Sequence, residues 1–104
     1  MRPIPLKLRK QIANNPFYKK CCITRSLNVS LEHCWIYNGK QINELWAIVP
    51  LDRELNTSHP PKDIKDKCRL ISLRRATKED LAKYPKFNWE QELNYLEQKY
   101  GSEI

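Results

Sequence analysis

The sequence predicts a single α+β domain, with two short strands at its centre and helices before and after them. Three observations support this prediction. Two runs of aromatic and β-branched residues, 31–37 and 45–49, lie on either side of a polar loop that contains the turn-forming pair Asn38-Gly39. Apolar residues recur at helical spacing in the segments that precede and follow these runs. The length of 104 residues is that of one ordinary domain.

The segment before the first strand is expected to contain one short helix. Leu8 and Ile12 lie four residues apart with polar and basic residues between them, which predicts an amphipathic helix that ends before Pro16. Residues 17–31 mix aromatic, β-branched and basic side chains. This mixture predicts an irregular or short extended segment that leads into the first strand.

The central stretch, residues 30–59, is predicted to form two strands followed by a short helix. Strand alternation within 31–37 places Glu32 and His33 on opposite faces. Both side chains can therefore serve one site only if the strand ends, bulges or twists there. The apolar run 45–49 is predicted to be the partner of the first strand.

A helix is predicted for residues 51–59, because Pro50 is favourable near a helix start. Asp52, Asn56 and His59 are spaced so that one face of this helix would carry all three side chains. The two prolines that follow are expected to end it.

The C-terminal part of the chain, residues 62–101, is predicted to be helical. Ile64, Cys68 and Ile71 form an apolar stripe on a helix over residues 62–75, which is also the most basic stretch of the sequence.

Capping residues mark two further helices. The sequence Thr77-Lys78-Glu79-Asp80 has the form of a capping box, with Asp in the place usually taken by Glu or Gln, and predicts a short helix to Lys83. Asn88 is expected to cap a final helix, which Gly101 closes. Its regularly spaced apolar residues are expected in the core: Trp89, Leu93, Leu96 and Tyr100.

The charge balance points to a polyanionic partner. Nineteen Lys and Arg residues against 12 Asp and Glu give a net charge of +7, and nucleic acid is the commonest partner of such a protein. No apolar run approaches 18 residues, so we expect no membrane span. The N-terminal residues lack the apolar region of a signal peptide, so the expected compartment is the cytoplasm.

The four cysteines do not have the spacing of a zinc site. Cys21 and Cys22 are adjacent, and neighbouring side chains of an extended chain point to opposite faces. No C-x2-C pair is present to complete a site with Cys34 or Cys68. The cysteines are therefore free thiols or metal ligands, and their spacing disfavours a structural zinc.

The polar residues of the central stretch suit hydrolysis of a phosphodiester bond. That reaction needs a group that takes a proton from water, and positive charge near the phosphorane oxygens and the departing alkoxide. A histidine titrates near neutrality and suits the first task, and a divalent cation suits the second. Simpler interpretations stay open: His33 as a core histidine, Asn43 as a turn residue, and Asn56 and His59 as helix-terminal groups.

The sequence EHCWIYNGKQINELWAIVPL resembles the HNH, or ββα-metal, endonucleases, in a form associated with bacteriophages and prophages. The tail, from residue 71 onward, also looks like such proteins. The resemblance implies a ββα-metal core with flanking helices, which cuts DNA with one divalent ion of the Mg²⁺ or Mn²⁺ type. It implies that His33 activates the water, that Glu32 and Asn56 bind the metal with His59 as an additional ligand, and that Asn43 positions the loop.

Two departures from the family pattern bear on activity. The first acid is Glu32 where Asp is usual, and Asp52 and Leu55 stand where a second cysteine pair is common. We therefore predict no structural zinc. The metal ligand on the predicted helix is open among Asn56, His59 and Asp52, and a weakened or inactive nuclease is one outcome.

The sequence thus predicts a DNA endonuclease in the cytoplasm of a bacterial host. Six basic residues are candidate phosphate contacts: Lys40, Lys62, Lys65, Arg69, Arg74 and Arg75. Two alternatives are a non-catalytic nucleic-acid-binding module on the same fold and, less favoured, a domain whose basic face meets an acidic protein partner.

Overall fold

The computed structural model describes residues 4–57 and 60–104, and in these residues a mixed α+β fold surrounds one main core. This confirms the predicted fold class at the level of α+β. The regular elements are α1 (Leu6–Ala13), β1 (Val29–His33), β2 (Ile36–Tyr37), β3 (Lys40–Gln41), β4 (Ile48–Asp52), α2 (Lys62–Arg75), α3 (Lys78–Ala82) and α4 (Trp89–Tyr100), with short 3-10 helices η1 (Pro16–Lys19), η2 (Leu45–Ala47) and η3 (Gly101–Glu103). No helix among them is long and apolar enough to cross a membrane.

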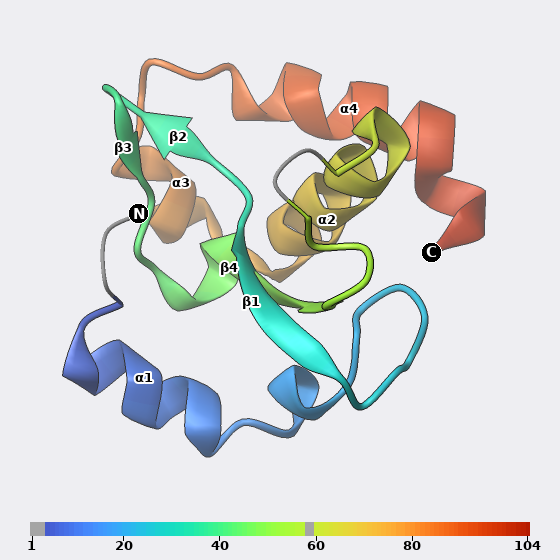
Figure 1. Ribbon diagram of the computed structural model, residues 1–104. Coiled ribbons are helices and arrows are strands. Elements are labelled where there is room, and N and C mark those ends of the chain that lie inside the picture. Colours follow the sequence, from blue (N-terminus) through green and yellow to red (C-terminus); the bar gives the residue numbers. More distant parts are fainter. Residues whose placement is uncertain (1–3, 58–59) are drawn as a thin grey trace.

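An antiparallel pair of strands, β1 and β4, crosses the middle of the molecule (Figure 1). Its register places Glu32 opposite Val49 and His33 opposite Ile48. Helix α1 lies below this pair and α4 runs along the top of the view, while β2 and β3 form a separate small hairpin. The first four residues of β4 are buried: Ile48 belongs to the cluster with Leu8 and Ile12 of α1, and Val49 and Leu51 belong to the main core.

The predicted strand over residues 31–37 is interrupted. β1 ends at His33 and β2 begins at Ile36, and the two residues between them, Cys34 and Trp35, are both buried. Successive side chains of a regular strand point to opposite faces, so burying both in one core requires a break. The Trp35 Nε1–H then donates to Ser72 Oγ on α2 over 2.8 Å, which anchors the break to the helix.

The predicted helix over residues 51–59 is wrong for the part that the structure describes. The second strand lies later than expected, so Leu51 and Asp52 complete β4 and Pro50 lies inside it. A proline is tolerated in a strand that has a free edge. The chain then turns, because the Asp52 carboxylate accepts a hydrogen bond from the Glu54 N–H over 2.9 Å and its carbonyl accepts one from Asn56.

The helices predicted on either side of the centre are confirmed. Helix α1 buries Leu8 and Ile12, and α2 covers residues 62–75 as expected. Both halves of the capping box form at the start of α3, where the Asp80 N–H donates to Thr77 Oγ1 over 3.1 Å. The Asn88 side chain caps α4 by accepting a hydrogen bond from the Gln91 N–H.

Trp89 and Tyr100 of α4 lie in the core, as predicted. Trp89 meets the Trp35 ring edge-on, with 5.0 Å between centroids, and also contacts Trp46. Gly101 follows α4, but its φ of −58° is helical and the chain continues into η3. A side chain there would come within 2.7 Å of Glu97 Oε1, so the Glu97 side chain would have to shift.

Candidate functional site

His33 lies at the last position of β1 and is paired with Asn43, which precedes η2. Its Nε2 is 2.6 Å from the Asn43 carboxamide oxygen. Because that oxygen only accepts hydrogen bonds, Nε2 carries the hydrogen and Nδ1 of the neutral ring carries a free lone pair. Nδ1 is buried and has no hydrogen-bond partner among the described residues. Such an atom costs about 1–3 kcal/mol unless water or a ligand satisfies it.

Glu32 and His33 line the same cleft, whose volume is about 410 Å³. The sequence requires β1 to end or twist for these neighbours to share a site, and the strand does end at His33. Partial burial raises the pKa of the Glu32 carboxyl, while the neighbouring His33, Lys65 and Arg69 side chains lower it in part. The carboxylate is therefore held in the cleft at an energetic cost.

Asn56 reaches this cleft from the turn after β4 rather than from a helix. Its NH₂ group donates to Ser30 Oγ over 2.7 Å and lies 3.5 Å from the Leu31 carbonyl oxygen. These contacts with β1 orient the carboxamide. Its oxygen has no hydrogen-bond partner in the described part of the chain. Asp52, the other alternative on the predicted helix, does not line the cleft.

The oxygen donors of Glu32 and Asn56 suit a hard divalent cation. Mg²⁺ is commonly held by one or two protein oxygens together with water and substrate phosphate. Within residues 4–57 and 60–104, no three or more His, Cys, Asp or Glu side chains gather as a metal site, so an ion here would depend on a small ligand set. The predicted additional ligand, His59, lies outside the described residues.

Two of the six candidate phosphate contacts, Lys65 and Arg69, line the cleft. Arg69 is held firmly: its Nε–H donates to the Cys34 carbonyl over 3.3 Å, and its guanidinium lies 5.2 Å from the Trp35 ring centroid. A cation fixed in this way needs little reordering when it meets a phosphate.

The other four candidates lie outside this cleft. Lys40 is exposed on β3, and Lys62 forms an ion pair of 2.8 Å with Asp66. The Arg74 guanidinium forms two hydrogen bonds with the Glu97 carboxylate, at 2.6 and 3.0 Å.

Arg75 has a role in the fold. Its guanidinium carbon lies 3.8 Å from the Phe17 ring centroid, and its NH1 donates to the Tyr18 hydroxyl over 2.8 Å. It thereby joins α2 to η1. This structural role could not be predicted from the sequence, where Arg75 is one of several basic residues in a basic stretch.

Several residues that support the site carry no distinctive sequence signal. The Gln41 side-chain oxygen is buried in the wall of the cleft without a hydrogen-bond partner among the described residues. Beside Asn43, the Glu44 carboxylate accepts hydrogen bonds from the Tyr84 hydroxyl and from Lys83, which ties this loop to the segment after α3. Single polar residues in loops cannot be told from ordinary surface positions by spacing alone.

Comparisons with protein-family models, with curated proteins and with solved structures gave no match to this chain. Any functional interpretation therefore depends on the residues and the geometry described above.

Proposed function

We propose that the protein is a metal-dependent DNA endonuclease of the HNH type, with His33 as the general base. The observation that carries the proposal is the 2.6 Å contact between His33 Nε2 and Asn43, which leaves Nδ1 buried and unpaired among the described residues, on a histidine that lines one cleft with Glu32 and Asn56. A basic nitrogen, two oxygen donors and two cations in one cleft match the needs of phosphodiester hydrolysis.

The arrangement of the central elements supports the same proposal. β1 and β4 are antiparallel and α2 is the next helix along the chain, which is the order of a ββα unit. The helix of that unit would be α2, beginning at Lys62, in place of the helix expected over residues 51–59.

The side chains take separate parts in the reaction. Nδ1 of His33 accepts a proton from the attacking water, and the Asn43 oxygen stabilises the imidazolium that forms. Glu32 and Asn56 would hold a divalent cation of the Mg²⁺ or Mn²⁺ type. When bound, that ion supplies positive charge to the phosphoryl oxygens and to the leaving oxygen. Lys65 and Arg69 attract and orient the phosphate.

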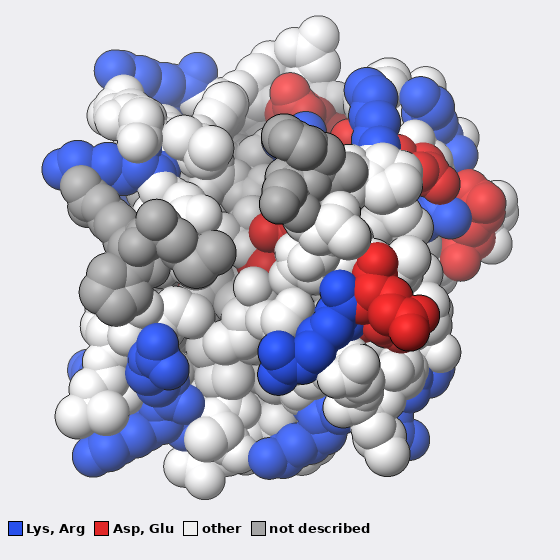
Figure 2. All heavy atoms as spheres, viewed as in Figure 1, with Lys and Arg blue, Asp and Glu red and all other residues white. Residues whose placement is uncertain are grey.

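The net charge of +7 supports DNA as the partner. On the face shown in Figure 2, Lys and Arg side chains lie mainly toward the edges, and Asp and Glu side chains lie among them on the right and near the centre. Basic side chains spread over the surface in this way suit contacts with the phosphate backbone of DNA.

A non-catalytic nucleic-acid-binding module is the second candidate. The small number of candidate metal ligands favours this second candidate, since no group of three metal-binding side chains is found in the described residues. Such a module would bind DNA with a steep salt dependence and without a metal requirement.

A plasmid-nicking assay with Mg²⁺ or Mn²⁺ tests the proposal. The parent protein is expected to convert supercoiled plasmid to the nicked or linear form, and the His33→Ala variant to be at least about 100-fold slower. EDTA is expected to stop cutting by the parent. Equal cutting by both proteins would remove His33 from the mechanism, and salt-sensitive binding without cutting would favour the second candidate.

A further inference from the structure

A second cavity lies beside the cleft, between α2 and α4. Its volume is also about 410 Å³. Helix α2 contributes Lys62, Asp66 and Arg69 to its lining, and α4 contributes Gln91, Glu92, Tyr95 and Leu96. Because Arg69 lines both cavities, they are adjacent. We call this cavity the α2–α4 pocket.

The inner wall of the α2–α4 pocket is built around a buried carboxylate. Asp66 is only 2% exposed. Its oxygens lie 2.8 Å from Lys62 Nζ, 3.7 Å from Arg69 NH1 and 3.4 Å from the Tyr100 hydroxyl, which donates to it. Both cations belong to α2, as Asp66 does, and the Tyr100 hydroxyl joins this carboxylate to α4.

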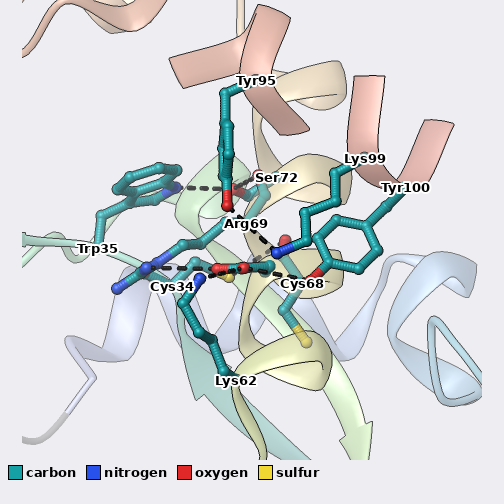
Figure 3. Close-up of polar contacts among 10 residues, drawn as sticks. Cys34, Trp35, Lys62, Cys68, Arg69, Ser72, Tyr95, Lys99 and Tyr100 are labelled. Atoms are coloured by element: carbon teal, nitrogen blue, oxygen red, sulfur yellow. Dashed lines mark hydrogen bonds and ion pairs between the residues drawn. The ribbon is translucent and has the colours of Figure 1, made fainter. Parts of the chain in front are cut away.

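An exposed aromatic ring forms the rim. Tyr95 is 48% exposed, which is unusual for a large aromatic residue on a helix that buries its other rings. In Figure 3 its ring projects from α4 toward Lys62 and Arg69, with Lys99 close by. The Lys99 ammonium donates to the Tyr95 hydroxyl over 3.3 Å, so the ring is oriented although it is not packed in the core.

The chemistry of the pocket favours an uncharged planar ligand. Its lining contains two basic side chains, Lys62 and Arg69, and two acidic ones, Asp66 and Glu92, so their formal charges balance. A phosphate would gain little here, whereas a ligand with donors and acceptors on its edge would find both kinds of partner. The Tyr95 ring is about half exposed, with the ammonium groups of Lys62 and Lys99 at 6.0 and 5.7 Å from its centroid, and its exposed part is the surface on which a ring can stack. A nucleobase has this combination of a polar edge and a π-face.

We propose that the α2–α4 pocket binds an unpaired base of single-stranded DNA, with Tyr95 stacking on it. This proposal rests on the proposed function, because it takes the phosphate next to that base to be the one held by Arg69 in the cleft. A base can enter only when it is unstacked from its partner strand. The protein should therefore prefer single-stranded or frayed DNA to a blunt duplex.

Fluorescence anisotropy of labelled oligonucleotides tests this proposal without depending on cleavage. The parent and its variants are titrated in EDTA with a single-stranded 12-mer and with the corresponding blunt duplex. Tyr95→Ala is expected to weaken single-strand binding about 10-fold, within the range for loss of one stacked aromatic residue. Duplex affinity should be unchanged. Tyr95→Phe keeps the ring and should bind like the parent, and Asn94→Ala is the matched control on the exposed face of α4.

The outcomes separate the two proposals. Unchanged single-strand affinity in Tyr95→Ala, or an equal loss for single strand and duplex, would overturn the base pocket even if the protein cuts DNA. An equal loss in Tyr95→Phe and Tyr95→Ala would overturn stacking in favour of the hydroxyl contact. Ring-dependent single-strand binding without any cleavage would support the pocket and reject the nuclease.

Discussion

Replacing Arg75 is predicted to damage the fold rather than the affinity for DNA. The central carbon of the Arg75 guanidinium lies 3.8 Å from the Phe17 ring centroid, and the guanidinium donates to the Tyr18 hydroxyl. Tyr18 is itself buried and bonds to the carbonyls of Leu45 and Ile48, at 2.6 and 2.9 Å. One guanidinium thus joins α2 to η1 and to the start of β4.

The expected size of the effect follows from these contacts. A partly desolvated cation–π contact contributes about 1–2 kcal/mol, and a hydrogen bond from a charged donor about 1.5–3 kcal/mol. Allowing for overlap between them, Arg75→Ala should lower the free energy of unfolding by about 3 kcal/mol. For a domain of this size that corresponds to a fall in Tm of roughly 12–20 °C.

Urea denaturation followed by tryptophan fluorescence measures this change. Arg74→Ala is the matched control, since its ion pair with Glu97 is near the surface and should contribute about 1 kcal/mol or less. Equal urea midpoints for the two variants would refute the reasoning. So would an Arg75→Ala variant with parental stability and a salt dependence of DNA binding reduced by about one phosphate contact.

Two further variants test the energetics of the cleft and of the break between β1 and β2. Burial raises the pKa of Glu32, so the folded state binds that proton more tightly than the unfolded chain, and folding is penalised once the pH exceeds the unfolded value of about 4.3. Glu32→Gln should therefore raise the urea midpoint at pH 7 and lose this advantage as the pH falls toward about 4. The same substitution should lower the cleavage rate. A urea midpoint that is unchanged at pH 7 would contradict the burial argument. Ser72→Ala should lower the free energy of unfolding by about 1–3 kcal/mol, because it leaves the buried Trp35 Nε1–H without its acceptor. The same denaturation assay measures it, and a loss well below 1 kcal/mol would show that the indole finds another partner.

The sequence was most informative where structure is local. The helices α1, α2, α3 and α4 were predicted because apolar spacing and capping residues such as Thr77 and Asn88 act within a few positions of one another. The centre was predicted less well, because its form depends on contacts between distant residues. Burial of both Cys34 and Trp35 breaks the first strand, and pairing with β1 draws Pro50 into β4.

The same division applies to the candidate site. The structure brings His33 and Asn43 into contact, and it places Glu32 and Asn56 in one cleft with His33. Helical spacing could not predict how Asn56 reaches the cleft, because Asn56 lies in a turn and not on a helix.

The number of basic residues in the sequence does not show which of them line the cleft and which stabilise the fold. Arg69 and Arg75 belong to the same helix, yet one faces the cleft and the other packs on Phe17. Their different roles depend on the aromatic residues that the fold places beside each.

Chemical rescue with imidazole tests most directly the claim that His33 is the base. Removing the side chain in His33→Ala leaves space beside Asn43 and the cleft, into which free imidazole can diffuse. We predict that imidazole restores metal-dependent plasmid cutting by His33→Ala in a concentration-dependent way, while it leaves an Asn56→Ala variant as slow as before. Failure of imidazole to restore cutting, or equal stimulation of both variants, would contradict the account.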